Sequence, residues 1–368
     1  MKIVSLVWFK IFPAKFGGQK GIALFLEHLT AYFDITCLCS RDNNYFGNSV
    51  KVIPKLPVGK WQFINPALWV SILLRIKKQN TDVLIIEHPY HAITGILAKK
   101  LLKVRLVLHQ HNIEHVRFRE LGYSWWPVLK FLESRLSKYA DLIFFKTSED
   151  QIKSIELFHL NPGKTFIVPY GIEERSFNKE ARLKISAMYN LSVNCKIFLF
   201  AGTLDYQPNA DAVENIYKKL LPHLDNAGID YSIIICGRNK IKSFEYLQKL
   251  SAKHVINAGE VDNIDDYFFA ADAFINPVTI GGGIQTKILD ALSYQLPVIC
   301  FDVMLSGIPS QFIGTWLYPT NQGDWKKFSC EMIRIKKPHF GSLSLDLLSI
   351  QSWDTIAKKT ANKIKLQA

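Results

Sequence analysis

The chain has 368 residues, 48% of them hydrophobic, and it carries 45 Lys and Arg against 32 Asp and Glu. This length provides ample core and favours two domains of ordinary size. The net charge of +13 excludes an acidic disordered chain and suits an anionic partner: a nucleotide, a nucleic acid or an acidic lipid surface. Because the basic residues are dispersed and no nucleic-acid module is recognisable, we expect no nucleic acid as partner.

The N-terminal residues 1–9 predict a buried first strand. They have no small-residue cleavage site, so they do not resemble a signal peptide. No window reaches 18 uncharged apolar residues, and we therefore expect at most peripheral contact with an anionic membrane. Six cysteines lack metal-ligand spacing and four of them lie in apolar, strand-like runs, which predicts reduced thiols in a cytoplasmic protein.

Apolar runs of strand length alternate with helical patterns, which predicts parallel sheets with crossover helices. In the first half the predicted strands are residues 2–9, 34–39, 82–88, 105–110, 141–146 and 165–170. The predicted helices of this half lie near residues 20–32, 66–79, 92–102 and 125–139. A second series of strands follows at 196–202, 231–237, 254–259, 272–277, 296–301 and 315–319.

Two such series predict an α/β protein with two Rossmann-like domains facing each other across a cleft. The boundary falls in the turn-rich segment 168–178. We predict domains at 1–170 and 171–345, followed by a helix at 346–368 that packs back towards the first domain. Ligands of such sheets bind beyond the carboxyl ends of the strands, so the cleft is the expected site.

The segment 281–291, GGGIQTKILDA, carries the most specific chemical signal. It follows a predicted short helix at 265–271 and a buried strand at 273–276. Glycines let the backbone approach a ligand closely, and the free N–H groups at a helix start attract anions. A strand, a glycine loop and a helix in this order predict phosphate binding, with a tight structural turn as the alternative.

Several segments in order resemble one family: HNIEHVRFRE at 111–120, VPYGIEERSFN at 168–178, AGTLDYQPN at 201–209, GGGIQTKILDAL at 281–292 and SWDTIAKK at 352–359. Together they resemble the family 4 retaining glycosyltransferases of the GT-B fold. The resemblance implies a nucleotide-sugar donor bound mainly by the second domain and a glycan or lipid-linked acceptor bound by the first. It also implies transfer with retained configuration, without metal or other cofactor, in cell-surface polysaccharide or glycoconjugate synthesis.

The glycine loop is the centre of the implied donor site. Backbone N–H groups at the helix start and the Lys287 cation would meet the charge that grows on the leaving diphosphate. The alternative for Lys287 is an ordinary solvated helix lysine. The predicted donor-binding residues are Gly17, Gly18, Gly202, Thr203, Arg238, Gly282, Gly283, Ile284, Lys287 and Asp290.

Two departures from the family pattern bear on the donor. Asp290 aligns with the second acid of the Glu-x7-Glu signature, which binds ribose hydroxyls, but Gly282 stands where the first acid contacts the sugar. The Arg and Lys that grip the diphosphate in many members are absent from 201–209. Arg238 supplies one such charge or is a plain turn arginine.

The first domain supplies the remaining predicted residues. His111 follows the strand 105–110, where the family has a histidine near the donor sugar, and we predict His111 and Lys287 as catalytic residues. Glu87, His88 and Asn112, also at carboxyl ends of strands, are predicted to bind the acceptor.

We expect neither a metal site nor a covalent nucleophile. His109, His111 and His115 lie within seven residues, but they lack partner cysteines and a HExxH pattern. Double displacement needs a carboxylate at the donor carbon, for which the chain offers no candidate. The resemblance instead implies same-face attack, in which the departing phosphate helps to take the acceptor proton.

Segments 60–78 and 122–138 combine aromatic with basic residues, as interfacial helices do. The alternative is a pair of amphipathic helices packed on a sheet. Two rival classes also stay open: a nucleotide-sugar epimerase, and a scaffold that has lost catalysis and serves as a binding partner. The sequence leaves the donor nucleotide, sugar, acceptor, linkage and oligomeric state undetermined.

Overall fold

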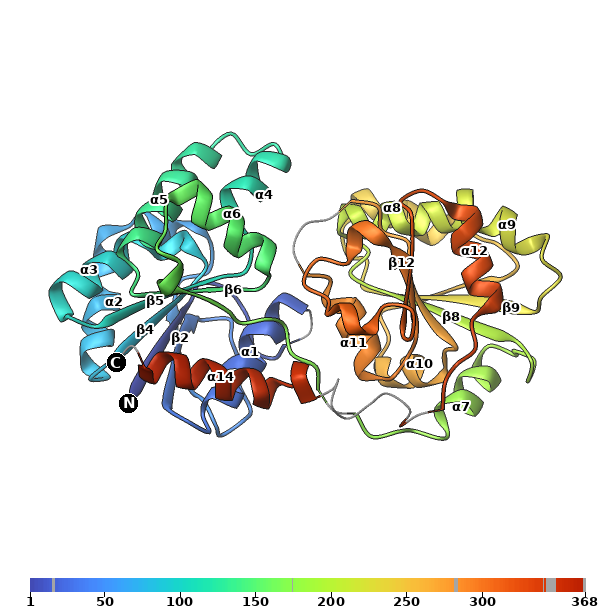
Figure 1. The fold of residues 1–368 in the computed structure, drawn as a ribbon, viewed down its shortest axis with the longest axis horizontal. Coiled ribbons are helices and arrows are strands. Elements are labelled where there is room, and N and C mark those ends of the chain that lie inside the picture. The colour runs from blue at the N-terminus through green and yellow to red at the C-terminus, as the bar shows by residue number, and fades with distance from the viewer. Residues whose placement is uncertain (15–16, 174, 281–283, 340, 342–348, 367–368) are drawn as a thin grey trace. The chain divides into compact units, whose positions relative to one another are not determined.

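The computed structural model describes residues 1–14, 17–173, 175–280, 284–339, 341 and 349–366. The chain divides into two compact units (Figure 1). The N-terminal unit comprises Met1–Gly171 and Trp353–Ala368, and the C-terminal unit comprises Ile172–Ser352.

The N-terminal unit is built on a parallel sheet of seven strands in the order β3-β2-β1-β4-β5-β6-β7. The strands are β1 (Lys2–Val7), β2 (Asp34–Ser40), β3 (Lys51–Leu56), β4 (Val83–Glu87), β5 (Arg105–Gln110), β6 (Leu142–Phe145) and β7 (Thr165–Ile167). Its helices are α1 (Gly17–Leu29), α2 (Pro66–Lys78), α3 (Ala92–Leu102), α4 (Glu114–Glu120), α5 (Trp126–Tyr139), α6 (Ser148–Phe158) and α14 (Trp353–Leu366). Short helical turns are η1 (Lys60–Phe63), η2 (Pro89–His91) and η3 (Pro162–Lys164).

The central strands of this sheet are buried on both faces, as parallel strands covered by helices must be. Every residue of β4 is buried, and so is every residue of β6. Helix α2 begins with Asn65, whose side chain accepts a hydrogen bond from the N–H of Ala67, and with Pro66 in the first turn. Asn65 satisfies one of the unpaired donors of the helix start, and Pro66, which has no backbone N–H, removes another.

The edge strand β3 is absent from the sequence prediction. Its sequence, KVIPKL, contains Pro54 and is mostly half-buried, so it lacks the continuous apolar run that marks the other strands. Proline is tolerated at an edge because one side of the strand has no ladder partner. The strand signal was therefore too weak in the sequence alone.

Helix α14 returns to the N-terminal unit and packs against α1. His28 Nδ1 of α1 lies 2.7 Å from Asp354 Oδ1, and Arg105 donates to the carbonyl of Ile364 at 2.9 Å. Trp353 is buried so close to Gly171 that a Cβ on this glycine would lie 2.4 Å from the indole. These contacts make the C-terminal helix part of the first unit.

The C-terminal unit is built on a parallel sheet of six strands in the order β10-β9-β8-β11-β12-β13. The strands are β8 (Lys196–Ala201), β9 (Tyr231–Cys236), β10 (Val255–Gly259), β11 (Ala273–Asn276), β12 (Val298–Phe301) and β13 (Leu317–Thr320). Its helices are α7 (Ala181–Met188), α8 (Gln207–Asn215), α9 (Leu221–Asp225), α10 (Ile264–Ala270), α11 (Thr286–Ser293) and α12 (Trp325–Arg334). The unit also contains a π-helix, η4 (Ile216–Leu220), and the 3-10 helices η5 (Lys242–Lys249), η6 (Asp302–Met304) and η7 (Ser310–Phe312).

Both sheets reverse their strand order beside the first strand, between β1 and β4 and between β8 and β11. Ligands of open α/β sheets bind at this switch point, outside the carboxyl ends of the strands. The predicted α/β class with two Rossmann-like sheets is confirmed. Among the described residues, no helix has the length and apolar character needed to cross a membrane.

Candidate functional site

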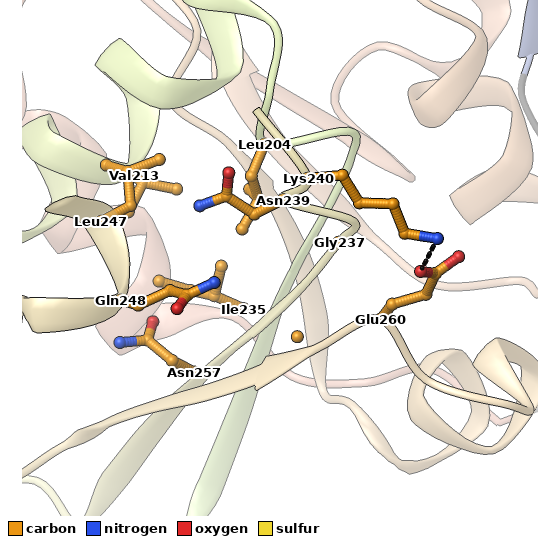
Figure 2. A pocket seen from close by; sticks show the side chains of 11 residues that line it. Leu204, Val213, Ile235, Gly237, Asn239, Lys240, Leu247, Gln248, Asn257 and Glu260 are labelled. Carbon is orange, nitrogen blue, oxygen red and sulfur yellow. Dashed lines mark ion pairs between the residues drawn. The ribbon is translucent and has the colours of Figure 1, made fainter. Parts of the chain in front are cut away.

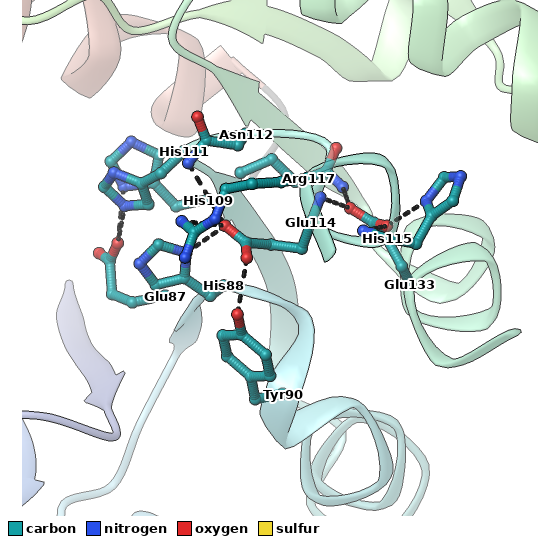
Figure 3. A network of polar contacts seen from close by, with 11 residues as sticks. Glu87, His88, Tyr90, His109, His111, Asn112, Glu114, His115, Arg117 and Glu133 are labelled. Carbon is teal, nitrogen blue, oxygen red and sulfur yellow. Dashed lines mark hydrogen bonds and ion pairs between the residues drawn. The ribbon is translucent and has the colours of Figure 1, made fainter. Parts of the chain in front are cut away.

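Buried ionisable side chains gather at the carboxyl edge of the N-terminal sheet (Figure 3). Glu87 ends β4, His109 lies near the end of the neighbouring strand β5, and His111 follows β5 directly. Parallel pairing brings these strand ends together. The side chains of Glu87 and His109 are fully buried, whereas His111 is slightly exposed.

Glu87 holds the two histidines. Its Oε2 accepts from His111 Nε2 at 2.8 Å and lies 3.0 Å from His109 Nδ1, while its Oε1 accepts from the Ser5 hydroxyl at 3.3 Å. Burial would raise the pKa of Glu87, but the two histidines more than offset this and hold it well below its ordinary value. Burial lowers the pKa of His109 to about 4 and that of His111 well below its usual range. Near neutral pH, Glu87 is therefore an anion beside two neutral imidazoles.

Lys146, directly after β6, balances the charge of Glu87. It is 3% exposed, and within the described parts of the chain its Nζ has no hydrogen-bond partner. Burial lowers the pKa of Lys146 to about 8, while the charge of Glu87 acts in the opposite direction. A buried cation without a hydrogen bond is costly, so Glu87 is needed to keep it charged.

The same three residues form a possible metal triplet. Glu87, His109 and His111 each offer one ligand atom, and these atoms lie within 4.8 Å of one another. The spacing of the histidines in the sequence did not predict this group, because Glu87 belongs to a different strand, β4. Lys146 already supplies a positive charge at Glu87, which disfavours a divalent cation there. Absence of a metal therefore stays a prediction.

Two further glutamates shape the loop that carries His111. Glu133 of α5 accepts from the backbone N–H groups of Glu114 and His115, at 3.0 and 3.2 Å, and from His115 Nδ1 at 2.7 Å. It thus satisfies unpaired donors at the start of α4. Glu114 accepts from the Tyr90 hydroxyl at 2.6 Å and lies 3.5 Å from Arg117. His115, the nearest residue that the Glu133 carboxylate binds, is 18 residues away in the sequence, so no local pattern predicts this contact.

The predicted acceptor residues have unequal access. Glu87 is 1% exposed and its oxygens are occupied by neighbours, so it lies beneath the site and not on its surface. His88 and Asn112 remain partly accessible, and both approach Glu114 Oε1, at 3.5 and 3.3 Å. The imidazoles of His88 and His111 lie side by side, with ring centroids 4.4 Å apart. His88, His111 and Asn112 thus form one polar surface supported by Glu87 and Glu114.

In the C-terminal unit, Lys287 points inward from the first turn of α11. Its Nζ donates to Asn209 Oδ1 at 2.5 Å and lies 5.4 Å from the centroid of the Phe200 ring. Burial lowers the pKa of Lys287 to about 7. The alternative of a solvated helix lysine does not fit this geometry.

Asn209 is a residue that the sequence analysis did not select. Its Nδ2 donates to the carbonyl of Thr203 at 2.8 Å, so the amide joins the β8–α8 loop to Lys287 of α11. A Cβ on Gly202 would lie 2.9 Å from Asn209 Nδ2, which explains why glycine stands there. Its place in the first turn of α8, shortly after a strand and a glycine, is the signal available in the sequence.

Other predicted donor residues lie around this loop. Arg238 follows β9 and pairs with Asp205 at 3.4 Å, so its charge is partly neutralised. Asp290 lies on α11, and its charge helps to raise the pKa of Arg175, although burial acts against that shift. Ile284 is half-buried just before α11. Gly282 and Gly283 lie outside the described residues.

Gly17 and Gly18 belong to the N-terminal unit, where they open helix α1. A Cβ built on Gly18 would meet no atom within 4 Å. The position is therefore open enough for backbone to approach a ligand. Both residues stay predictions for the donor site.

A pocket of about 150 Å³ lies at the carboxyl ends of β8, β9 and β10 (Figure 2). Its polar rim includes Asn239 and the ion pair of Lys240 with Glu260, at 3.0 Å, and its floor includes Leu204 and Ile235. None of the predicted donor residues lines this pocket. The recess is mainly apolar and lies next to the β8–α8 loop, which contributes Leu204 to its lining.

Comparison with solved structures shows the fold. Sucrose-phosphate synthase from Thermosynechococcus elongatus superposes with a TM-score of 0.74 at 14% identity, covering 100% of this chain and 99% of that one. HepE of Anabaena, in complex with UDP and glucose, superposes with a TM-score of 0.71 at 16% identity over 100% of both chains. The architecture is that of the GT-B glycosyltransferases.

Two protein-family models match the sequence and indicate the class of enzyme. Residues 17–175 match the model "Glycosyltransferase Family 4", and residues 195–335 match "Glycosyl transferases group 1". A relative in sequence is the Escherichia coli UDP-Gal:alpha-D-GlcNAc-diphosphoundecaprenol alpha-1,3-galactosyltransferase, 24% identical over 292 residues, which are 74% of this chain and 72% of that protein. With the fold, these matches support a GT-B glycosyltransferase of group 1. They do not favour an epimerase or a scaffold without catalysis.

Proposed function

We propose that this chain is a retaining glycosyltransferase that moves a hexose from a UDP-sugar to a lipid-linked glycan at the cytoplasmic face of a membrane. One observation carries the donor half: the Lys287 amine, placed by Asn209 beside the β8–α8 loop at the carboxyl edge of the sheet. The E. coli relative named above uses UDP-Gal and a diphosphoundecaprenol acceptor, and HepE was solved with UDP. These relatives support uridine as the base and a lipid carrier as the acceptor.

The donor chemistry follows from charge. Departure of UDP leaves a growing negative charge on its β-phosphate, and fixed N–H donors with a cation stabilise it. In this proposal Lys287 supplies the cation, while Gly282, Gly283 and Ile284 supply backbone N–H groups. The low pKa of Lys287 without a ligand means that a bound diphosphate would draw a proton onto the amine.

The rest of the donor is assigned by position. Asp290, one turn after Lys287 on α11, accepts hydrogen bonds from the ribose hydroxyls. The recess between Leu204, Asn239 and Glu260 receives the base. Gly17, Gly18, Gly202, Thr203 and Arg238 complete the proposed donor contacts.

On the acceptor side, His111 is the proposed catalytic histidine. Its Nε2 is held by Glu87, which directs the other ring nitrogen, Nδ1, away from that carboxylate. His88 and Asn112 share its polar surface and are proposed to bind the acceptor. Within the described residues of this surface, Glu87 is the carboxylate nearest His111 and it is buried, so a same-face attack without metal or covalent intermediate is the proposed mechanism.

Nucleotide binding tests the donor assignment. We expect UDP at 100 times its Kd to stabilise the protein by about 2.7 kcal/mol, and GDP or ADP to have a much smaller effect at the same concentration. Thermal unfolding with each nucleotide measures this difference. Equal melting temperatures with and without all three nucleotides would contradict the proposal.

Product analysis tests the reaction. Incubation with a UDP-hexose and a polyprenyl diphosphate sugar should yield a product whose new linkage keeps the α-configuration of the donor, readable from its anomeric proton coupling. A β-linked product would refute retention, and release of free hexose alone would refute transfer to this acceptor class.

A further inference from the structure

The N-terminal unit carries apolar side chains on its outer surface that its own core does not use. From η1 to α2 these are Trp61, Ile64, Val70 and Leu74; on the α4–α5 connection and α5 they are Leu121, Tyr123, Val128 and Phe131. Trp61 is 76% exposed and Phe131 59%. We call these eight residues the apolar rim.

Both parts of the apolar rim lie on one side of the sheet. Helix α3 packs against both α2 and α5, so the three helices stand in a row. Lys60 joins the two parts at the carboxyl edge, where its Nζ lies 5.7 Å from the Tyr123 ring and 5.5 Å from the Trp125 ring. Inner aromatics such as Phe63 and Trp125 pack on a small cluster around Tyr90 beneath this edge. The rim is thus continuous with the edge that carries His88 and His111.

Helix periodicity separates the rim from the core. On α2, Ile72, Leu73 and Ile76 are buried, while Val70 and Leu74 are four residues apart on the outer face. On α5, Leu129 and Leu136 are buried, while Val128 and Phe131 are exposed. Packing on the sheet explains the inner stripes of both helices, but it does not explain the outer ones.

The charge around the rim is strongly positive. Segments 58–78 and 117–138 contain nine basic residues and two acidic ones, and one of those acids, Glu133, is buried. Lys77 and Lys78 end α2, and Lys130, Arg135 and Lys138 lie exposed on α5. Long basic side chains beside exposed aromatic and aliphatic groups are typical of surfaces that enter the headgroup region of an anionic bilayer.

We propose that the apolar rim docks on an anionic lipid bilayer, inserting its aromatic and aliphatic side chains among the headgroups. This orientation brings the His111 edge to the membrane surface, where the diphosphate and sugars of a lipid-linked acceptor lie. The role of docking in acceptor binding rests on the proposed function. The inference that the apolar rim binds membranes rests only on the exposure of its side chains and on the charge around them. Insertion of Trp61 and Phe131 removes apolar area from water, and the basic residues contact lipid phosphates.

Flotation with vesicles tests the inference. At low salt the whole protein should bind vesicles of phosphatidylcholine and phosphatidylglycerol, and bind pure phosphatidylcholine vesicles at least about tenfold more weakly, because several basic residues contribute. The double variant Trp61→Ser, Phe131→Ser should lose at least about tenfold in partitioning to anionic vesicles, since two large apolar groups no longer insert. Tryptophan emission should shift to shorter wavelength on binding in the wild type.

The matched control removes exposed apolar groups elsewhere. Leu183→Ser, Val193→Ser changes two residues of the C-terminal unit that are 72% and 92% exposed, and vesicle binding should stay within twofold of wild type. Equal loss in the control and the rim variant, or no wild-type binding to anionic vesicles at low salt, would overturn the proposal. Sedimentation showing a dimer that the rim variant abolishes, without vesicle binding, would assign the rim to a second copy of this chain and also overturn it.

Donor binding separates this inference from the proposed function. The rim variant should keep the wild-type melting shift with UDP and the wild-type transfer rate to a short-chain acceptor dissolved in water. Its transfer to a long-chain acceptor embedded in vesicles should fall about tenfold, in line with lost partitioning. Full loss of UDP binding in the wild type would reject the donor assignment while leaving the vesicle result intact.

Discussion

The two units share a strand order but use the carboxyl edges of their sheets in opposite ways. In the N-terminal unit, that edge is filled with ionisable side chains bound to one another, with Glu87 and Glu114 as buried acceptors. In the C-terminal unit, the described part of the edge combines glycines such as Gly202 with the inward Lys287 and with the ion pairs of Arg238 with Asp205 and of Lys240 with Glu260. A preassembled side-chain network suits recognition of hydroxyl groups, whereas an edge of N–H donors and a cation suits a diphosphate.

The largest expected effect comes from removing the cation of the C-terminal edge. Lys287→Gln should lower the transfer rate at least about 100-fold, because the diphosphate charge loses its main counter-charge. Initial rates of sugar transfer measure this loss. Lys326→Gln, an exposed lysine of α12, is the matched control and should retain full activity. Equal rates for Lys287→Gln and wild type would mean that the two edges do not differ as described.

In the N-terminal edge, the first test breaks the charge balance. Glu87→Gln leaves Lys146 buried without its counter-charge and should lower the unfolding free energy by about 3 kcal/mol. Urea unfolding followed by circular dichroism measures it. Glu87→Gln with Lys146→Met should recover most of that stability, but transfer should stay impaired because the neutral amide is a weaker acceptor for His111 than the carboxylate that orients it. Recovery of full activity in the double variant would make Glu87 purely structural.

The pH dependence of donor binding distinguishes the lysine from the histidines. Lys287 is protonated below its pKa of about 7 and neutral above it, so UDP should bind about tenfold more weakly at pH 8 than at pH 6. Titration calorimetry across this range measures the trend. In Lys287→Gln the slope should vanish, while His111→Gln should keep it. A slope retained in Lys287→Gln would assign the titration to another group.

Asn209 tests whether the lysine must be positioned. Asn209→Ala removes the acceptor at Lys287 and the link to Thr203, and UDP should bind about fivefold more weakly, as expected for about 1 kcal/mol of lost hydrogen bonding. Asn209→Asp keeps the oxygen and adds a charge, which should raise the pKa of Lys287 and move the pH midpoint of UDP binding upward. Asn226→Ala, on the surface after α9, is the control. An unchanged midpoint in Asn209→Asp would rule out the positioning role.

The smallest expected effect is that of a chelator. Dialysis against EDTA should change the transfer rate less than twofold, because we propose that Lys146, and not a divalent ion, balances Glu87. Metal content by mass spectrometry and rates before and after dialysis provide the measurement. Loss of activity that zinc or another divalent ion restores would show instead that Glu87, His109 and His111 hold a metal.

Several features were readable from the sequence because they depend on local pattern. The buried strand predicted at 273–276 is observed as β11 over the same residues, since a short apolar run ended by Pro277 has few other solutions. The helix predicted at 265–271 is α10, shifted by one residue. The sequence predicted Lys287 as the phosphate cation from its position one turn after the glycines, and that role stays a prediction; its contact with Asn209 was not predicted. The edge strand β3 was not predicted, because it contains a proline and is only partly buried.

Composition and periodicity thus determined the α/β class and the two sheets, because burial and backbone geometry act over a few neighbouring positions. The tertiary structure alone decided which charges meet. Glu87 and His111 are 24 residues apart, and Lys287 and Asn209 are 78 apart, so parallel pairing and helix packing had to bring them together. Whether an ionisable side chain is buried, paired or exposed depends on those distant neighbours, and so do its pKa and its chemistry.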